Sequence, residues 1–529
     1  MKITIIGGGT AGWLSALYFV SRNIKTDKKT GKPINENIWD ITVIDTDKVP
    51  IIGAGEGSTG LLADAVALRL KKIPEITEWD FLTKTESTLK LGIRFKDWNG
   101  IGTEFLSPIQ PTETANYSLD YHFAISAAYG KSHLSVLNGW MMENEYSSFY
   151  TDKKHSTLSH AYHFDAHKVG QFFKDVALKY NVKHINAEVV GLNRNGMSGD
   201  LDSVKLDDGS TFESDMWIDC SGFARVLIKP MGGGWKTYSE HLPTNSAIPF
   251  LQQYEKDENI LAETLAWAQP NGWMWQIPTQ ARYGSGYVYC DHFTNYENAV
   301  DELQKNIGKK IEPIKNLKFE AGRVEKCWVN NVIAMGLSAG FLEPLQATSI
   351  HSTIVQLDSF VLHKLMATKE ETCLESNREL FNRVIANLFD EFRDLIQIQY
   401  MNDREDTEFW KYCKYGLPKT DRVKQILETC KYRVPSHNDF DGHHGVAGWG
   451  VWCWTLDGLR HFSIETAKKH LKLYRFDTDA DLAYNHVQKN FNTYAYRLIK
   501  NKQFIELLKA GKITKPIMDQ KRVPISPAQ

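Results

Sequence analysis

A glycine-rich turn near the N-terminus contains the first residues with the spacing of a ligand-binding motif. Gly7, Gly9 and Gly12 form a GxGxxG motif. The motif follows an apolar segment at residues 2–6 and opens a segment of helical periodicity at residues 10–21. In such a turn the first glycine permits a tight bend, the second lets the backbone approach a pyrophosphate, and the third lets the helix pack on the strand. The motif predicts a dinucleotide site at a helix N-terminus.

The next apolar segment supplies a carboxylate that suits the ribose of a dinucleotide. Residues 41–44 are apolar and end at Asp45, which can accept hydrogen bonds from ribose hydroxyls. Thr10 and Ala11 open the helix and are expected beside the phosphates. Residues 23–37 are polar and lysine-rich, so we expect a loop insertion there. The alternative is a glycine-rich turn without a ligand; the strand–helix–strand context, which also predicts a parallel sheet, favours the nucleotide.

The composition is that of an ordinary globular chain. Of 529 residues, 42% are hydrophobic and 24% are charged, which excludes a disordered chain, a collagen-like fibre and a heptad rod. Lys and Arg (62) nearly balance Asp and Glu (64), and a net charge of −2 argues against a protein that coats nucleic acid or an anionic membrane. The length allows about three or four domains, but no linker divides the chain, so we expect interleaved parts.

The cysteines and the apolar segments indicate the cellular compartment in which the protein is expected. The seven cysteines are odd in number, scattered and without a CxxC pair, so neither a disulfide framework nor a zinc site is predicted and a reducing cytoplasm is expected. No apolar run reaches the roughly eighteen residues that a membrane helix needs. The N-terminal residues mimic a signal peptide, but the glycine motif interrupts the apolar region, so we expect no export.

Periodicity predicts further elements along the chain. Apolar residues repeat at helical spacing at residues 61–71, 164–180, 354–366, 377–400 and 420–430. Buried strands are expected at residues 215–220 and 329–335. The tail after residue 513 has three prolines and is expected to fray.

Both expected strands indicate which dinucleotide is bound. Residues 215–222 and 332–340 each form an apolar strand that ends in a turn of small residues. Both resemble the later FAD-contacting strands of the large two-domain flavoproteins, and Gly336 lies in the second turn. Leu337 stands where an acidic residue often meets the FAD chain. The sequence has no second strand–GxGxxG–helix unit for a nicotinamide, so a bound flavin would have to be reduced by something else.

A pair of tryptophans indicates more closely which class of flavoprotein the chain resembles. Trp273, Trp275, Ile277 and Pro278 form a WxWxIP motif. The plain alternative is an alternating core strand with two aromatic residues on one face. Together with the GxGxxG turn, the motif resembles the flavin-dependent halogenases, and the chain is similar to the tryptophan-halogenase branch. Further stretches that resemble this family are residues 52–58, 161–167, 219–223 and 340–350, so the resemblance spans roughly residues 1–410.

The resemblance implies an α/β fold. We expect an FAD-binding Rossmann-like module of the two-domain flavoprotein monooxygenase type, together with a largely helical substrate-binding part. The FAD-binding module would take residues 1–115, 160–240 and 320–360. The substrate-binding part would take residues 116–159, 241–319 and 361–515, followed by a tail at 516–529. Beyond the glycine turn, the implied FAD contacts are Gly53, Glu56, Ser58, Gly336 and Pro344.

The resemblance also implies a reaction. Reduced FAD (FADH2) and O2 would convert a halide ion to hypohalous acid, which would pass through an internal tunnel to a lysine beside an aromatic ring. The tryptophan pair would keep organic substrates away from the flavin. Backbone N–H groups of Thr348 and Ser349 would hold the halide, with Ser349 replacing a glycine of the family. The implied partners are a separate NAD(P)H-dependent flavin reductase and a small aromatic substrate; the oligomeric state stays open, a homo-oligomer included.

Lys90 lies in the position of the family's catalytic lysine. Hypohalous acid is indiscriminate, so a protein must hold it in one place. A buried ammonium can hydrogen-bond it, a neutral amine can trap it as a haloamine, and burial lowers a lysine pKa. Lys90 alternates with Leu89 and Leu91, so its amine is expected on the opposite face of a short strand. The alternative is a solvated lysine, the commoner fate of this residue type.

Gln346 departs from the family pattern. Tryptophan halogenases have a glutamate at this position of an EPLExT stretch, where a carboxylate can orient the oxidant and deprotonate the cationic ring. An amide forms hydrogen bonds but is not a general base near neutral pH. The proton of the ring would then go to another group such as Glu343 or Glu56, or to water. Alternatively, an electron-rich ring reacts with little need for a base. Related phenol and pyrrole halogenases lack this glutamate, so the departure weakens free tryptophan as substrate more than it weakens halogenation.

A glycine-rich segment at residues 442–454 is the candidate substrate wall. It has three tryptophans, Trp449, Trp452 and Trp454. The segment could form a mobile aromatic wall of the substrate pocket or, as an equal alternative, a tight turn packed under helices. The adjacent His443 and His444 would point apart on regular structure, and we expect no metal site.

These patterns together predict a halogenase that acts on an electron-rich aromatic compound of the indole or phenol type. A flavin-dependent aromatic monooxygenase is the alternative, and the WxWxIP motif and Lys90 argue against it. A third class is a non-catalytic flavin-binding relative, against which Lys90 and both tryptophans argue. The residues leave open the substrate, the ring position, the preferred halide and the base.

Overall fold

The computed structural model describes residues 1–30, 33–48, 55–109, 116–151, 156–157, 159–440, 448–473, 475 and 479–513. Three expectations lie outside these residues: the flavin contact at Gly53, the segment 442–447 with its two histidines, and the tail 516–529. Among the helices of the described residues, none combines the length and the apolarity that crossing a membrane requires.

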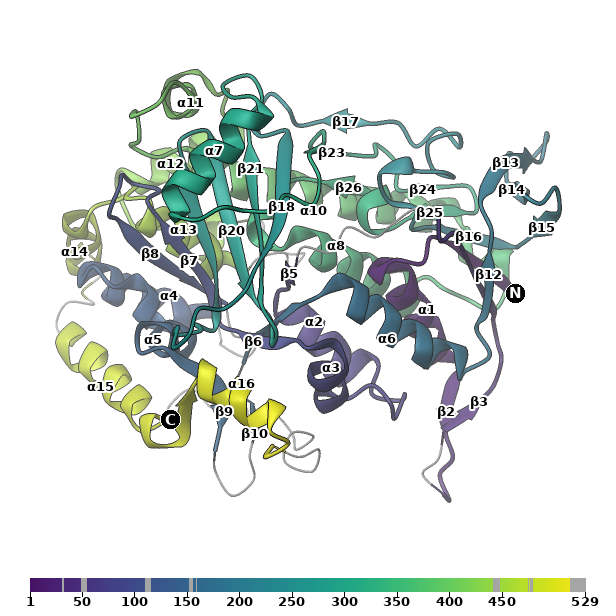
Figure 1. The fold of residues 1–529 in the computed structure, drawn as a ribbon, viewed down its shortest axis with the longest axis horizontal. Coiled ribbons are helices and arrows are strands. Elements are labelled where there is room, and N and C mark those ends of the chain that lie inside the picture. The colour runs from purple at the N-terminus through teal and green to yellow at the C-terminus, as the bar shows by residue number, and fades with distance from the viewer. Residues whose placement is uncertain are drawn as a thin grey trace.

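A six-stranded sheet contains the predicted N-terminal strands. Its order is β12 (Lys183–Asn186), β4 (Asp40–Asp45), β1 (Lys2–Ile6), β16 (Met216–Asp219), β25 (Val332–Ala334) and β24 (Trp328–Val329). All neighbours are parallel except β24 and β25. Helix α1 (Thr10–Asn23) follows β1 and packs against α6 (Ala166–Leu178). The expected parallel α/β unit is confirmed. It lies on the side of the molecule where the N-terminus is marked, at the right of Figure 1.

Three expected elements differ in detail. Residues 23–37 contain two paired strands, β2 (Ile24–Thr26) and β3 (Pro33–Asn35), so the insertion is not a plain loop. The strand expected at residues 329–335 is instead β24 and β25, because Asn330 adopts a positive φ of 51° and reverses the chain. The helix expected from residue 164 begins at Ala166, because the Asp165 side chain caps it by accepting from the next backbone N–H groups.

A seven-stranded sheet forms the second layer. It is the largest element of the fold whose strands were not predicted from the hydrophobic periodicity. Its order is β22 (Leu317–Lys318), β18 (Ser246–Gln252), β21 (Tyr283–Tyr289), β20 (Gly272–Pro278), β19 (Glu263–Gln269), β7 (Gly92–Lys96) and β8 (Glu104–Pro108). Only β19 and β7 pair in parallel. The sheet therefore joins two strands at residues 92–108 to strands from the middle of the chain, while the proposed domain boundaries stay a prediction.

The two faces of this sheet differ in what covers them. Helix α7 (Tyr296–Ile307) covers one face, where its Ala299 and Leu303 pack with Met274 and Tyr287. Residues alternate across a strand, so Trp273 and Trp275 of β20 lie on the other face. The face with the two tryptophans is called the Trp face below.

A small antiparallel sheet takes its strands from three separate parts of the first 164 residues. Its order is β5 (Glu56–Gly57), β11 (Ala161–Phe164) and β6 (Thr88–Lys90). Leu91 joins β6 to β7, and its N–H donates to the carbonyl of Ala262 at 2.7 Å. Three further small sheets are β10 (Ser156–Thr157), β9 (Tyr146–Tyr150) and β27 (Leu498–Lys500); β13 (Val189–Arg194), β14 (Leu201–Leu206) and β15 (Thr211–Glu213); and β17 (Lys236–Thr237), β23 (Gly322–Arg323) and β26 (Gly340–Phe341).

Helices dominate after residue 348, as the periodicity predicted. They are α8 (Thr348–Leu357), α9 (Lys369–Thr372), α10 (Glu375–Tyr400), α11 (Glu408–Lys411), α12 (Asp421–Cys430), α13 (Trp449–Gly458), α14 (Ile464–Leu473), α15 (Ala480–Asn492) and α16 (Asn501–Lys509). Earlier helices are α2 (Gly60–Asp64), α3 (Glu78–Thr85), α4 (Asn116–Ala128) and α5 (Leu137–Glu143).

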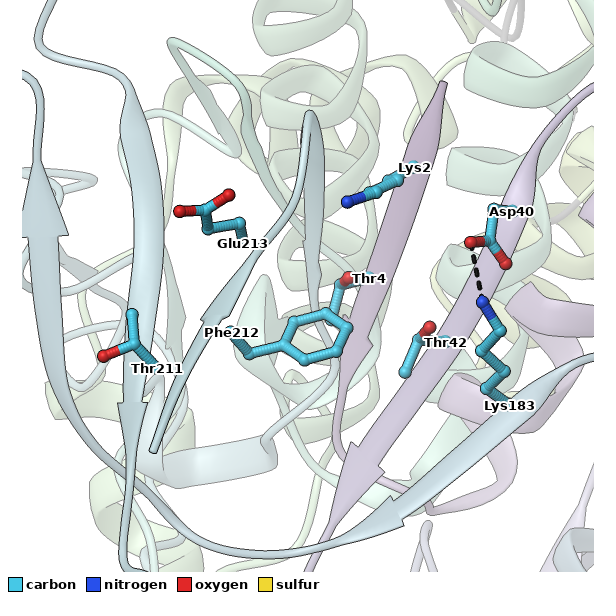
Figure 2. Close-up of a pocket in the computed structure, with 8 residues that line it drawn as sticks. All are labelled: Lys2, Thr4, Asp40, Thr42, Lys183, Thr211, Phe212 and Glu213. Carbon is cyan, nitrogen blue, oxygen red and sulfur yellow. Dashed lines mark hydrogen bonds and ion pairs between the residues drawn. The ribbon is translucent and has the colours of Figure 1, made fainter. Parts of the chain in front are cut away.

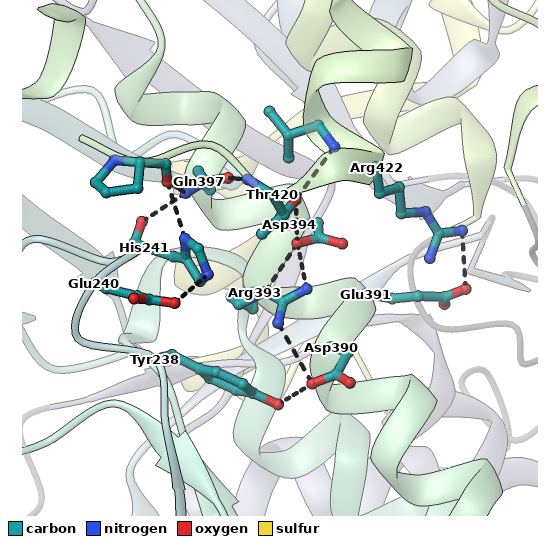
Figure 3. Close-up of polar contacts among 12 residues, drawn as sticks. Tyr238, Glu240, His241, Asp390, Glu391, Arg393, Asp394, Gln397, Thr420 and Arg422 are labelled. Atoms are coloured by element: carbon teal, nitrogen blue, oxygen red, sulfur yellow. Dashed lines mark hydrogen bonds and ion pairs between the residues drawn. The ribbon is translucent and has the colours of Figure 1, made fainter. Parts of the chain in front are cut away.

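Polar contacts join α10 to the segment between β17 and β18 and to the start of α12 (Figure 3). Tyr238, which lies between β17 and β18 in the chain, donates its hydroxyl hydrogen to Asp390. Asp394 pairs with Arg393 at 2.8 Å and accepts from the Thr420 hydroxyl at 3.0 Å, at the start of α12. The Gln397 amide donates to the His241 carbonyl at 3.1 Å. These contacts hold the helical part and the sheets in one body.

Candidate active site

The glycine turn is built to receive an anion. Gly7 has φ +109°, and a Cβ there would lie 2.3 Å from the Cys220 carbonyl oxygen. A Cβ at Gly12 would lie 1.9 Å from the Gly7 oxygen, whereas one at Gly9 would meet nothing within 4 Å. The first turn of α1 has no acidic side chain and no side-chain cap. Its N–H groups therefore face open space at Gly9, as a pyrophosphate requires.

Asp45 lies directly over this turn. A Cβ at Gly8 would be 1.6 Å from Asp45 Oδ2, so only glycine permits this approach. The other carboxylate oxygen bonds the ring of His184, which lies on the neighbouring strand β12. His184 had not been singled out from the sequence, because its pairing with β4 depends on strand order. The carboxylate is thus fixed at the end of β4, where a ribose would accompany a pyrophosphate at the turn.

Two other predicted flavin contacts meet at the start of α1. Gly336 has φ +63°, and a Cβ there would lie 2.9 Å from the Cβ of Ala11. The Thr10 hydroxyl donates to the carbonyl of Ala166 at 3.2 Å, which ties the helix start to α6. Pro344 is exposed, at the first position of a short 3₁₀ turn. The residues present therefore fit a flavin dinucleotide around the turn, Asp45 and Gly336.

Residues 55–58, called the strap below, lie against the Trp face. Gly55 has φ +78°, and a Cβ there would lie 2.9 Å from the Cα of Gly284 in β21. The Ser58 hydroxyl accepts from the Tyr162 backbone N–H at 2.8 Å, so this predicted flavin contact also extends the ladder to β11. Burial, followed by the charge of Asp165, raises the pKa of Glu56 to about 7.

Lys90 is buried, in agreement with its expected place on a strand. Only 3% of the residue is exposed, and Leu89 and Leu91 are fully buried. Burial lowers the pKa of the Lys90 amine to about 7. Within the described residues, its Nζ forms neither a hydrogen bond nor an ion pair. The amine therefore exchanges between charged and neutral forms near neutral pH.

Strand register identifies the neighbours of Lys90. Lys90 pairs with Ala161, Thr88 pairs with His163, and Gly57 pairs with His163 from the other side. Paired residues share a face, so Lys90, His163 and Gly57 lie on one face of the small sheet. A Cβ at Gly57 would lie 2.9 Å from Lys90 Nζ and 3.4 Å from Thr264 Oγ1. The missing side chain at Gly57 lets the lysine extend over the sheet to Thr264.

Thr264 links the lysine to the tryptophan pair. On β19, Ala266 pairs with Trp275 and Ala268 pairs with Trp273. Thr264 is two residues from Ala266, so its hydroxyl lies on the Trp face. The Thr88 hydroxyl, on the lysine strand, also donates to the carbonyl of Pro278 at 2.7 Å. The structure thus brings Lys90 and the WxWxIP motif together, which sequence spacing could not show.

The tryptophan pair is rigidly packed. Trp273 is 1% exposed, and the ring centroids of Trp273 and Trp275 are 6.2 Å apart. A Cβ at Gly286 would lie 2.0 Å from the Trp275 ring, so this glycine leaves the slot in which the ring lies. Ile277 is buried on the same face. This packing fixes an aromatic layer beside the lysine.

The turn after β26 contains the predicted halide contacts. Ala347, with φ +56°, caps α8, and Thr348 and Ser349 begin the helix, where backbone N–H groups lack intrahelical partners. Gln346 is 7% exposed, and its amide nitrogen has no hydrogen-bond partner in the described part of the chain. An uncharged donor beside a helix N-terminus favours an anion there.

The two glutamates considered as substitute bases lie in different surroundings. Both carboxylate oxygens of Glu343 accept from the Tyr400 hydroxyl at 2.8 Å, and one also accepts from Thr244. Burial raises the pKa of Glu343 to about 7, and the Trp273 indole lies near it without hydrogen-bonding geometry. Glu56 precedes Gly57 on β5 and therefore points to the opposite face of the small sheet.

The three C-terminal tryptophans lie on a helix. Trp449, Trp452 and Trp454 are buried on α13. The Trp454 indole donates to the Ser135 hydroxyl at 3.1 Å. The three residues therefore lie on a packed helix and not in a tight turn, and a role for them in the substrate pocket stays a prediction.

A surface pocket elsewhere is not a candidate site (Figure 2). Its lining includes Lys2, Asp40 and Lys183, which begin β1, β4 and β12, and Asp40 pairs with Lys183 at 2.8 Å. These are the amino ends of parallel strands, whereas open α/β sheets bind ligands at the carboxyl ends. The pocket therefore lies on the edge of the sheet away from the glycine turn.

These features define an α/β enzyme of the two-domain flavin-binding class. A family model described as tryptophan halogenase matches residues 2–458. Tryptophan 7-halogenase RebH of Lentzea aerocolonigenes is 31% identical over 472 residues, which cover 84% of this chain and 85% of that protein. Tryptophan 7-halogenase KtzQ of a Kutzneria strain is 30% identical, with 84% of each chain covered. The chain belongs to the tryptophan halogenase family and is a flavin-dependent oxidoreductase.

Solved structures share this fold. A tryptophan halogenase from Shewanella frigidimarina superposes with a TM-score of 0.85, at 23% identity, over 96% of this chain and 98% of that one. Tar14, a tryptophan C-6 flavin-dependent halogenase from taromycin biosynthesis, gives 0.83 at 24% identity, over 96% and 99%. The predicted fold class is confirmed.

Proposed function

We propose that the chain is an FADH2-dependent halogenase that halogenates an electron-rich aromatic compound through Lys90. The observation that supports this most directly is the meeting of the unpaired Lys90 amine, Thr264 and the tryptophan pair on one face of the seven-stranded sheet. The 31% identity to a tryptophan 7-halogenase supports an aromatic substrate.

The nucleotide end of the site would hold FAD. The N–H groups at the start of α1 would bind the pyrophosphate, and Asp45 would accept from the ribose. When bound, reduced flavin supplies the reaction of O2 with a halide that gives hypohalous acid. The backbone N–H groups of Thr348 and Ser349 and the Gln346 amide would hold the halide.

Lys90 would receive the oxidant and aim it. With a pKa of about 7, the ammonium can donate hydrogen bonds to hypohalous acid and the amine can trap it. The packed tryptophans would exclude the organic substrate from the flavin side. The internal passage from flavin to lysine stays part of the proposal, as do the FAD contacts of Glu56, Ser58 and Pro344.

The substrate would be an indole or a phenol with an activated ring. Gln346 cannot accept the ring proton, and the oxygens of Glu343 are occupied by Tyr400 and Thr244. With Gln346 unable to act as a base and Glu343 held by these hydrogen bonds, the ring would lose its proton to water. An activated ring does so because its cationic intermediate is better stabilised.

One reaction mixture tests the proposal. The purified chain, FAD, a flavin reductase, NADH and O2 are supplied with chloride or bromide and a panel of indoles and phenols. Mass spectra are searched for halogen isotope patterns. We expect a halogenated product that depends on the reductase. A hydroxylated product, or flavin reduction by NADH without the reductase, would instead support an aromatic monooxygenase.

A further inference from the structure

Thr264 is a polar neighbour of Lys90 with no part in the reaction as described above. Lys90 Nζ and Thr264 Oγ1 lie 2.9 and 3.4 Å from one point, the position of a Cβ at Gly57. The amine and the hydroxyl therefore border the same small space. Thr264 is buried, so its hydroxyl has to find its partners inside the protein.

His163 fixes the direction of the Thr264 hydroxyl. Its Nε2 lies 2.9 Å from Thr264 Oγ1, and the residue is fully buried. Its other ring nitrogen has no partner within the described residues. Burial and the charge of Lys90 hold the pKa of His163 well below its usual range, so the ring is neutral. Whichever nitrogen bears the proton, the Thr264 hydroxyl keeps one unused hydrogen-bonding capacity.

No charged group on the neighbouring strands competes for this space. Glu263 lies on the opposite face of β19 and pairs with Arg94 at 2.7 Å. Glu56 points to the opposite face of β5, and Asp165, beyond β11, pairs with Arg282 at 3.3 Å. Within the described residues, the space beside Lys90 is therefore bordered by a neutral hydroxyl and a neutral imidazole.

We propose that Thr264 is a further catalytic residue, oriented by His163, and that its hydroxyl and the Lys90 amine together hold the hypohalous acid. The amine donates to the oxygen of the oxidant, and the hydroxyl makes the second hydrogen bond. Two contacts fix the direction of the halogen, which one flexible amine cannot do. This inference rests on the proposed function.

Thr264→Val and Thr264→Ser form the matched pair that tests it. Valine keeps the shape of threonine without the hydroxyl, and serine keeps the hydroxyl. The first readout uses the full chain without added flavin: an amine-reactive reagent labels Lys90 across a pH series, and peptide mass spectrometry gives the midpoint. Because the dipole of a nearby hydroxyl stabilises the ammonium and a methyl group does not, Thr264→Val should move the midpoint down by about 0.5 pH unit or more, and Thr264→Ser should not move it.

The second readout compares two products of the complete reaction. Hypohalous acid that escapes is captured by a diffusible phenolic trap, and halogenated substrate is measured beside it. Thr264→Val should lower the ratio of product to escaped oxidant by about tenfold, as expected for loss of one positioned hydrogen bond. His163→Phe, which leaves the hydroxyl in place but unoriented, should lower the same ratio and repeats the test if the valine variant is unstable.

The outcomes separate this inference from the proposed function. If Thr264→Val and His163→Phe keep the wild-type ratio and Thr264→Val keeps the labelling midpoint, the inference is overturned while halogenation stands. If the wild type yields neither oxidant nor halogenated product, the proposed function fails, and the labelling series still decides whether Thr264 contacts the amine.

Discussion

Lys90 is a single residue whose burial destabilises the fold. A lysine with 3% exposure and no acidic partner among the described residues must give up its proton or lose its hydration. Its pKa of about 7 lies below the ordinary value, so between pH 7 and pH 10 the unfolded chain binds more protons than the folded chain. Stability therefore rises with pH across that window.

Lys90→Met should stabilise the protein at neutral pH. The substitution keeps the length of the side chain and removes the ionisation, so we expect the free energy of unfolding to rise by on the order of 2–4 kcal/mol at pH 7 and by less at pH 9. Denaturant unfolding at both pH values measures this difference. Lys205→Met, at an exposed position on β14, is the control and should change stability equally at both. A Lys90→Met variant that is less stable than the wild type at pH 7 would contradict the burial of an unpaired amine.

At Gln346, a substitution tests whether the missing carboxylate limits which aromatic rings react. Gln346→Glu restores a carboxylate beside the start of α8, where it can deprotonate or stabilise a cationic ring. We expect the variant to halogenate less activated indoles that the wild type leaves unchanged, measured as product across a series of ring substituents. Gln346→Met, which offers neither charge nor donor, is the control. An unchanged substrate profile in the glutamate variant would count against this role.

At the scale of elements, the small sheet determines where the lysine can reach. Gly57 on β5 has no positive φ, so an alanine there is not strained by its backbone. The added methyl carbon would lie 2.9 Å from Lys90 Nζ.

Gly57→Ala should therefore displace the amine from Thr264. We expect halogenation to fall by about tenfold or more, on the scale of a misplaced catalytic group, while FAD affinity, measured by fluorescence titration, stays within about twofold. Gly191→Ala, on strand β13, is the control, because its Cβ would meet only ordinary contact at 3.5 Å. Unimpaired halogenation in Gly57→Ala would show that the lysine acts from another position.

Local patterns predicted the elements whose chemistry depends on short spacing. The glycine turn, Asp45 and the buried strand of Lys90 follow from residues close together in the sequence, and the structure has each of them. The seven-stranded sheet could not be delimited, because its parallel pairing of β7 with β19 joins residues about 170 apart.

The residues that sequence reasoning missed share the same cause. His163 and Gly57 lie in stretches that resembled the family, but their position beside Lys90 depends on the register of three strands. Thr264 precedes the WxWxIP motif without any local signal. Helix α13 was not predicted, because a glycine-rich start hides a helix whose burial is set by tertiary packing.

At the scale of the whole molecule, two sheets divide the work. The glycine turn follows β1 and Asp45 ends β4 in the six-stranded sheet, whereas the tryptophan pair and Thr264 belong to the seven-stranded sheet and Lys90 to the small sheet beside it. The strap joins them, because Gly55 lies against β21 while Gly57 lies under Lys90. In this account an oxidant generated at the first sheet is used at the second, and the two activities can be separated by a single substitution.

The most direct test measures both activities in Lys90→Ala. With FAD, reductase, NADH, O2 and halide, the variant and the wild type are compared for FAD affinity, for escaped hypohalous acid and for halogenated substrate. The account predicts that FAD binding and oxidant formation survive while substrate halogenation falls by at least about a hundredfold, as for the loss of a group essential to the transition state. Retained halogenation, or loss of FAD binding, would contradict it.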